Sequence, residues 1–150
     1  MRRVELLSPA KNVDVAIAAI NNGADAVYIG GPAFGARKAV GNSLEDIEKA
    51  VRYAHRFYCR VFVTLNTILY DEELPEVERL IHDLYRIGVD AIIVQDPAVL
   101  KLDLPPIALH ASTQMHNYDL ERIKFLDRLG FPRIVLAREL SLEQLREIRR

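Results

Sequence analysis

The densest group of chemically capable side chains in this sequence is the segment His110-Ala-Ser-Thr-Gln-Met115. It follows a short apolar run, so an imidazole, two hydroxyls and an amide stand together where a predicted strand ends. Interpreted as a site, the segment offers His110 for proton transfer and Ser112, Thr113 and Gln114 for substrate binding. The alternative is a capped strand end whose polar groups satisfy loop backbone. A Ser–His hydrolase fits less well, because no orienting acid is evident.

Other polar side chains also directly follow apolar runs. Asn66 comes after the third run, and Gln95 and Asp96 come after the fourth. We expect all three to bind substrate, because ligands meet the carboxyl ends of parallel strands. The loop Gly30-Gly-Pro-Ala-Phe-Gly-Ala-Arg37 adds one arginine, which either binds a phosphate or belongs to a plain connection between strand and helix.

Arg138 and Glu139 follow the sixth apolar run and complete the candidate set. Arg138 either binds an anionic group, since arginine is well suited to phosphate or carboxylate, or forms a structural ion pair with other charges nearby. We treat His110, Arg138 and Glu139 as the catalytic candidates. No metal site is predicted.

These residues need a scaffold, and the sequence indicates one by alternation. Short runs rich in β-branched residues alternate with amphipathic helical stretches, which is typical of strands buried on both faces of a parallel sheet. The predicted strands are Val4–Leu7, Ala26–Ile29, Val61–Leu65, Ala91–Val94, Ile107–His110 and Ile134–Leu136. The phrase Gly23-Ala-Asp-Ala-Val-Tyr-Ile29 recurs as Gly88-Val-Asp-Ala-Ile-Ile-Val94, and Gly130 opens a looser copy. Each glycine suits the left-handed end of a helix.

Helix starts are also visible. The predicted caps are Asn12, Ser43 with Asp46, Asp71, Asp119 or Asn117, and Ser141 with Gln144, and a short helix follows Pro97. At the end of the second helix, Tyr53, Phe57 and Tyr58 form an aromatic cluster. Packing between helix and sheet is the ordinary explanation, and a platform for stacking RNA bases is the alternative.

Two architectures fit six successive strand–helix units. The dinucleotide-binding fingerprint Gly-x-Gly-x-x-Gly, expected of an open doubly wound sheet, does not follow the first strand. The even repeat favours an α/β fold with a parallel, TIM-barrel-like (β/α) sheet, of which about six of the eight units are present. We therefore expect residues 1–150 to be the N-terminal portion of a single barrel whose remainder lies outside this sequence.

The charges at the other end of the predicted strands are expected to serve solubility and stability. They are Glu5, Asp25, Arg60, Asp90 and Arg133. The sequence has 20 Lys and Arg and 21 Asp and Glu, and the resulting net charge of −1 gives no overall positive field that would attract nucleic acid. The one cysteine excludes an intramolecular disulfide framework and a multi-cysteine metal site within this chain. Without an apolar run of roughly 18 residues, no membrane association is expected, and the cytoplasm is the default location.

Seven segments, in this order, resemble one family, the collagenase-like peptidases (peptidase family 32 of the unknown-mechanism class). The resemblance covers essentially the whole chain. The segments are Glu5-Leu-Leu-Ser-Pro-Ala10, Gly23-Ala-Asp-Ala-Val-Tyr-Ile-Gly-Gly31, Phe34-Gly-Ala-Arg37, Val63-Thr-Leu-Asn-Thr67, Gly88-Val-Asp-Ala-Ile-Ile-Val-Gln-Asp96, His110-Ala-Ser-Thr-Gln-Met115 and Leu136-Ala-Arg-Glu-Leu-Ser-Leu142.

This resemblance implies a function for the full-length protein. Its relatives include hydroxylation proteins that act without oxygen on transfer RNA, ribosomal RNA or ubiquinone precursors, with prephenate as hydroxyl donor. An RNA hydroxylation factor is therefore expected, a peptidase of unknown catalytic type is the alternative, and a barrel fragment without activity of its own is the second alternative. Some relatives hold an iron–sulfur cluster through four downstream cysteines. Cys59 does not match a ligand, so no cofactor is expected within this chain.

The expected partners are RNA or a small-molecule substrate. Six strands of an eight-stranded barrel would leave the first and last strands without neighbours, and open sheet edges tend to pair with other chains. We therefore expect the 150-residue chain by itself to associate, with a homodimer as the simplest form.

Overall fold

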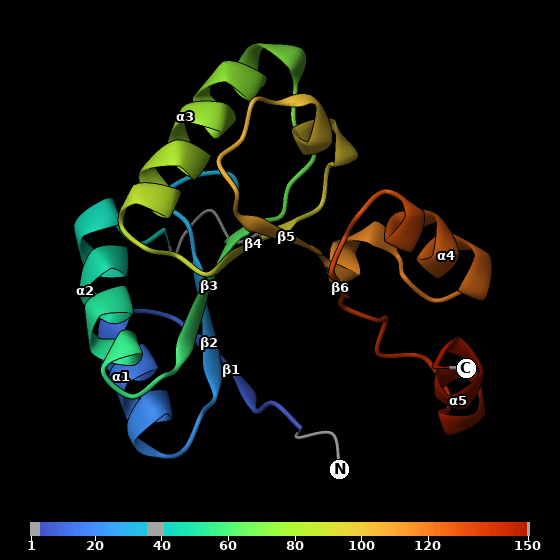
Figure 1. The fold of residues 1–150 in the computed structure, drawn as a ribbon, viewed down its shortest axis with the longest axis horizontal. Helices are drawn as coiled ribbons and strands as arrows, with labels where there is room; N and C mark the ends of the chain where they lie inside the picture. Colours follow the sequence, from blue (N-terminus) through green and yellow to red (C-terminus); the bar gives the residue numbers. More distant parts are fainter. Residues whose placement is uncertain (1–3, 36–40, 150) are drawn as a thin grey trace.

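The fold is a curled sheet of six parallel strands in sequential order, seen in a computed structural model that describes residues 4–35 and 41–149. The strands are β1 (Leu7–Ala10), β2 (Ala26–Gly30), β3 (Arg60–Leu65), β4 (Ala91–Val94), β5 (Ala108–Ala111) and β6 (Arg133–Ile134). Each strand pairs only with its neighbours in sequence. Figure 1 shows the strands near the centre of the molecule and the helices around them. This order confirms the TIM-barrel-like prediction.

Helices alternate with the strands. The α-helices are α1 (Val13–Asn21), α2 (Leu44–His55), α3 (Leu74–Arg86), α4 (Leu120–Arg128) and α5 (Leu142–Ile148). The described residues also form the short 3-10 helices η2 (Asp71–Glu73), η3 (Pro97–Lys101) and η4 (Thr113–Met115). The connection from β4 to β5 therefore carries only η3 where the other connections carry an α-helix.

The strands contribute to two separate apolar clusters, one on each face of the sheet. Side chains such as Val61, Val63 and Leu65 point outward and pack against the helices in the main core. The alternate residue of β3, Phe62, faces the concave side together with Ala91 and Ile93 in a smaller cluster. This split follows from the period of two along a strand, which sends successive side chains to opposite faces.

The predicted helix starts are confirmed with one exception. Asn12, Ser43, Asp119 and Ser141 each accept a backbone N–H bond in the first turn, and Gln144 completes a capping box with Ser141. Asp119 rather than Asn117 thus opens α4. The exception is Asp71, which does not cap α3. It begins η2 instead, and α3 starts three residues later at Leu74.

Strand bounds also differ from the predictions, most of all at the two edges of the sheet. β1 begins at Leu7, not Val4, and includes Ser8 and Pro9, which the apolar pattern placed after the strand. Val4 is 87% exposed, so its apolar character reflects no core contact. Proline is tolerated because β1 is an edge strand. β6 is shorter than predicted and ends at Ile134.

Four helices end with one shared geometry. After α1, α2, α3 and α4, a residue with positive φ is followed by a buried residue whose N–H bonds back five residues, as Cys59 does to the carbonyl of Ala54. Gly23, Gly88 and Gly130 occupy the positive-φ position at φ values of 95°, 91° and 93°, which confirms their predicted role. At α2 the same position holds Tyr58, at φ 56°.

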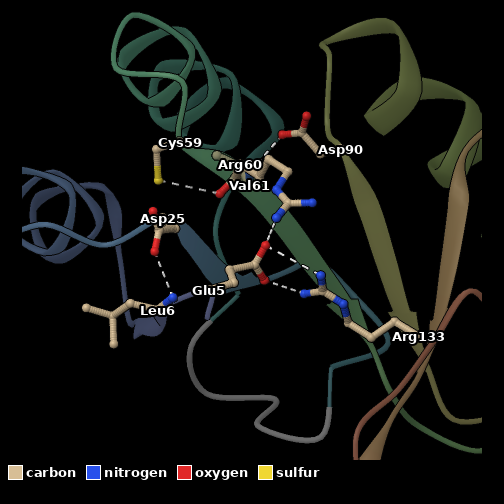
Figure 2. Close-up of polar contacts among 8 residues, drawn as sticks. All are labelled: Glu5, Leu6, Asp25, Cys59, Arg60, Val61, Asp90 and Arg133. Carbon is tan, nitrogen blue, oxygen red and sulfur yellow. Dashed lines mark hydrogen bonds and ion pairs between the residues drawn. The ribbon is translucent and has the colours of Figure 1, made fainter. Parts of the chain in front are cut away.

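Just beyond these helix ends, charged side chains tie the amino ends of the strands together (Figure 2). Asp25 accepts the N–H of Leu6 at 2.9 Å, and Asp90 accepts the N–H of Val61 at 2.7 Å. Each carboxylate thus bonds to the backbone at the amino end of the neighbouring strand.

Glu5 makes a wider connection at the same end. It forms ion pairs with Arg60, the first residue of β3, and with Arg133, the first residue of β6. Because β1 and β6 are opposite edges of the sheet, this carboxylate bridges the curled sheet from one edge to the other. The prediction that the charges at this end serve stability is consistent with these contacts.

Replacing Glu5→Gln should lower the free energy of unfolding by about 1 kcal/mol, because two arginines lose their shared counter-charge at a partly exposed position. Urea unfolding at low and high salt measures the effect, which should shrink as salt screens the wild-type pairs. Asp46→Asn, which breaks an exposed pair with Lys49, is the control and should change stability less. Equal losses in both variants would contradict the bridging role.

Replacing Tyr58→Gly should raise the free energy of unfolding by about 1 kcal/mol, since glycine adopts positive φ without the steric penalty of a side chain. Gly130→Ala is the reverse change at an equivalent helix end. A Cβ at this position has open space around it, so backbone strain alone should lower the free energy of unfolding by about 1 kcal/mol. Thermal unfolding of both variants measures the pair. A loss of stability in Tyr58→Gly would show that the tyrosine ring contributes packing.

Candidate functional site

The candidate site residues divide between the concave interior of the sheet and its carboxyl rim. His110 belongs to the interior, which corrects the expectation that it ends its strand at the rim. It is the third residue of β5, only 6% exposed, and pairs in register with Arg133. Its ring meets the Phe62 ring edge-on, with centroids 4.9 Å apart. β5 runs one residue further than predicted, to Ala111, so His110 lies within the strand, and the alternation of side chains points it to the concave face.

Positive charges surround this histidine. The guanidinium of Arg133 lies 5.3 Å from the centre of the Phe62 ring and that of Arg60 lies 5.8 Å from it. Burial, followed by the charges of Arg133 and Arg60, lowers the pKa of His110 from 6.5 to about 4. The imidazole is therefore neutral near pH 7. Its Nδ1 is buried and has no hydrogen-bond partner in the described part of the chain.

The carboxyl rim holds the other candidates. Asn66, Gln95 and Ser112 each directly follow a strand, and because the strands are parallel these positions lie at the same end of the sheet. Thr113 and Gln114 continue from Ser112 into η4. Arg138 and Glu139 lie in an exposed turn four residues beyond β6. The predicted common end is thus observed for these residues, but not for the side chain of His110.

A pocket of about 560 Å³ opens at this rim beside α4. It lies where the connection from β4 to β5 has only the short η3, and the loop after β5 forms its other wall. Its lining residues are Ile68, Gln95, Asp96, Pro97, Gln114, Met115, His116, Asp119, Arg122, Phe125 and Leu126. Of the predicted substrate-binding residues, it brings together Gln95, Asp96 and Gln114. Asn66, Ser112, Thr113, Arg138 and Glu139 are not among its lining residues.

Several of the polar side chains at this rim already serve the fold. Asp96 accepts the N–H groups of Leu69 and Ala98 at 3.0 and 2.9 Å, so it fixes two rim loops. The Ser112 hydroxyl is buried and accepts the N–H of Gln114 at 3.2 Å, as a cap of η4. Thr113 donates to the carbonyl of Leu136 at 3.5 Å.

The side chains that remain uncommitted are fewer. Gln95, Gln114 and His116 line the pocket and make no side-chain hydrogen bond within the described residues. His116 has a left-handed backbone at φ 55°, where η4 ends. Arg122 donates to the carbonyl of Met115 at 3.0 Å, so its guanidinium is partly engaged. Two amides and an imidazole are therefore the groups with which a ligand would form hydrogen bonds.

Asn117 has a structural role that the sequence analysis missed. It is completely buried, and its amide donates to the carbonyls of Ser112 and Val135 at 2.8 Å each. The backbone carbonyl of Asn117 accepts the N–H of Ala137 at 3.0 Å. Asn117 thus fastens the β5 rim to the segment that leads to Arg138. Its place between the rim motif and the helix cap Asp119 is the only sequence signal for this role.

Two further expectations concern ligand sites. Arg37 lies outside the described residues. Within the described ranges, no three His, Cys, Asp or Glu side chains gather as a metal site. No helix among those ranges has the length and apolar character needed to cross a bilayer.

The sequential parallel sheet with a rim pocket defines a barrel-type α/β protein, and solved structures show the same fold. The U32 peptidase Mk0906 superposes with a TM-score of 0.82 at 14% identity, over 99% of this chain and 65% of that chain. The 3-hexulose-6-phosphate synthase of Salmonella typhimurium superposes with a TM-score of 0.69 at 20% identity, over 97% and 70%. At these identities the likeness concerns the fold alone.

The family is defined by sequence. The model of peptidase family U32 matches residues 11–150, and the chain belongs to this family. It is 60% identical over 146 residues to the 23S rRNA 5-hydroxycytidine C2501 synthase of Escherichia coli, which is 97% of this chain and 22% of that protein. It is 39% identical to tRNA hydroxylation protein P of Helicobacter pylori, over 100% and 37%.

The name collagenase also occurs among these relatives. The Collagenase of Porphyromonas gingivalis is 31% identical over 96% of this chain and 35% of that protein. The chain thus spans between about a fifth and two fifths of the length of these relatives. The expected resemblance to this family is confirmed.

His110 should make the fold sensitive to acid. Because its folded pKa of about 4 lies below the unfolded value of 6.5, the folded state binds this proton less tightly than the unfolded chain. Its contribution to stability is therefore complete above pH 6.5 and is lost as the pH falls toward 4, by on the order of 3 kcal/mol.

Urea unfolding between pH 7 and 4.5 tests this, with His110→Gln as the comparison. The variant should lose less stability over that interval than the wild type, since it carries no titrating group there. Parallel pH profiles for the two proteins would show that His110 does not control this loss.

Proposed function

We propose that the protein containing this chain is an enzyme that hydroxylates a pyrimidine of ribosomal or transfer RNA without molecular oxygen, with prephenate as hydroxyl donor. The observation that carries this proposal is the 60% identity to the 23S rRNA 5-hydroxycytidine C2501 synthase over nearly the whole chain. The tRNA hydroxylation protein at 39% identity points to the same class of substrate.

Within this proposal, the rim pocket receives the nucleobase. A pyrimidine presents ring nitrogen, carbonyl and amino groups along one edge, and RNA-binding proteins read such edges with side-chain hydrogen bonds while the base face rests on apolar or aromatic groups. Gln95, Gln114 and His116 offer uncommitted donors and acceptors, and Met115 and Phe125 offer apolar surface. The pocket volume of about 560 Å³ lies in the range of small-molecule sites.

The catalytic candidates take different positions in this proposal. His110 is neutral and lies beneath the rim, so it would shape the concave interior rather than contact the base. Arg138 and Glu139 lie in the exposed turn beyond β6, and Arg138 offers a cation for the carboxylates of prephenate. Arg37, Asn66, Ser112 and Thr113 remain proposed as substrate-binding residues.

The peptidase alternative has less support in the site. A serine nucleophile needs a base in hydrogen-bond reach of its hydroxyl. The Ser112 hydroxyl instead accepts a backbone N–H, and the His110 ring packs against Phe62. The observation that favours a peptidase is the name of the Porphyromonas gingivalis relative, Collagenase. A barrel segment without activity of its own remains the second alternative for these 150 residues alone.

An iron–sulfur cluster does not fit the described residues. Cys59, the one cysteine, is buried at the amino end of β3, far along the strand from the rim, and burial raises the pKa of its thiol. A cluster in the full-length protein would need cysteines outside these 150 residues.

The remaining proposals concern location and assembly. An RNA substrate places the protein in the cytoplasm, with no membrane partner. The 150-residue chain by itself has β1 and β6 as sheet edges, so we propose that it self-associates as a homodimer. Light scattering over a range of concentrations tests this, and a clean monomer at high concentration would contradict it.

Mass spectrometry of RNA nucleosides tests the function. Cells lacking the full-length gene should lose one hydroxylated pyrimidine, and the wild-type gene should restore it. Gln114→Leu should reduce the restored modification about tenfold, because loss of hydrogen bonds to a buried polar edge costs roughly this much. Glu143→Gln on the exposed face of α5 is the control and should restore it fully. Unchanged nucleosides in the deletion strain would refute the proposal.

A further inference from the structure

The end of α2 carries two exposed aromatic rings that the fold does not use. Tyr58 is 96% exposed and Phe57 is 53% exposed, so packing between helix and sheet does not explain them. Only Tyr53 has that role: it packs against the main core, and its hydroxyl donates to Asn21 at 2.7 Å. The centres of the Phe57 and Tyr53 rings lie 5.2 Å apart, so one side of Phe57 contacts Tyr53.

The backbone makes Tyr58 more unusual. The three other helix ends of this geometry use glycine at the positive-φ position, and this one uses a tyrosine at φ 56°. A side chain at positive φ is strained and is kept where the surroundings or the function require it. The Tyr58 ring makes no ring contact or hydrogen bond in the described part of the chain, so its surroundings do not supply the reason.

The charge beside the rings indicates what they contact. Arg56, in the same turn, is exposed and has no ion pair among the residues that the structure describes. Two carboxylates at the amino end of the sheet are engaged elsewhere: Glu5 pairs with Arg60 and Arg133, and Asp90 accepts the N–H of Val61 and contacts His55. An uncommitted cation next to two exposed rings matches the phosphates and bases of single-stranded nucleic acid.

We propose that Arg56, Phe57 and Tyr58 form a platform on which unpaired bases of the RNA substrate stack, at the amino end of the strands and away from the rim pocket. This inference rests on the proposed function for its choice of RNA. It adds a second contact region, which would hold the RNA while the rim pocket receives the reacting nucleobase. A protein partner on the same surface is the competing outcome of the test.

Fluorescence anisotropy with the full-length protein tests the platform. The probes are a labelled single-stranded oligoadenylate of about 20 nucleotides and an abasic strand of equal length. Tyr58→Ala should weaken binding of the oligoadenylate about tenfold and leave the abasic strand nearly unchanged, since one stacking contact is lost. Tyr58→Phe should bind as the wild type does. Arg56→Gln should weaken both probes alike, because it removes a phosphate contact.

Tyr58→Gly separates this role from a structural one. It should weaken oligoadenylate binding as Tyr58→Ala does, although it relieves backbone strain and stabilises the fold. Tyr85→Ala, which removes another exposed tyrosine on α3, is the matched control and should leave both affinities unchanged. Wild-type affinity in Tyr58→Ala, or a wild-type protein that does not prefer the oligoadenylate, would overturn the platform. A Tyr58 effect confined to association with a protein would overturn it as well.

The nucleoside assay distinguishes the two proposals. If the full-length protein hydroxylates RNA while the Tyr58 variants bind like the wild type, the platform is wrong and the function stands. If binding depends on Tyr58 while no hydroxylated nucleoside depends on the protein, the platform stands and the function is wrong.

Discussion

Phe62 is the side chain on which the interior of the curled sheet depends. Among the described residues no helix packs on the concave face, so strand side chains must fill it. Phe62 is buried there, with Arg60 and Arg133 over its ring and His110 at its edge. An aromatic ring is apolar enough to pack with Ala91 and Ile93, and its face still attracts cations. This combination allows charged residues so close to the interior.

The charges at the amino end follow from the same constraint. Two arginines beside one ring repel each other, and Glu5 provides the counter-charge for both. Since Arg60 and Arg133 begin β3 and β6, their shared partner draws distant strands together across the concave side. Burial keeps His110 neutral, and these two arginines add to the effect, because a third positive charge there would have no partner. The curvature of the sheet, the ion pairs of Glu5 and the protonation of His110 therefore depend on one another.

The sequence predicts most of the fold because its signals are local and repeated. The phrase from Gly23 to Ile29 combines a left-handed helix end, a carboxylate that bonds to neighbouring backbone, and an apolar strand, and the copy at Gly88 does the same. Strand ends were harder to predict, because Val4 is apolar but exposed, and β5 continues past its last large apolar residue. Because β5 continues to Ala111, His110 lies within the strand, and alternation along the strand points its ring at Phe62 in the interior.

Burial and hydrogen bonding of individual polar groups could not be predicted from spacing. Ser112 and Asp96 have the residue types of a binding site, yet each accepts a backbone N–H that fixes a loop. Asn117 has the residue type of a helix cap and instead fastens two loops from a buried position. Which polar side chains remain free for a ligand depends on contacts between residues that are distant in sequence.

The two ends of the sheet consequently differ in what they leave free. Among the described residues at the amino end, Glu5, Asp25 and Asp90 have partners within the chain, and the rings and the cation at the end of α2 are left uncommitted. At the rim, Asp96, Ser112 and Asn117 hold the loops so that Gln95 and Gln114 stay uncommitted in the pocket. This division agrees with the general placement of binding sites at the carboxyl ends of barrel strands. At the amino end, Tyr58 has the positive φ that the three other helix ends give to glycine, and its ring is 96% exposed, so it adds little to the packing of the fold.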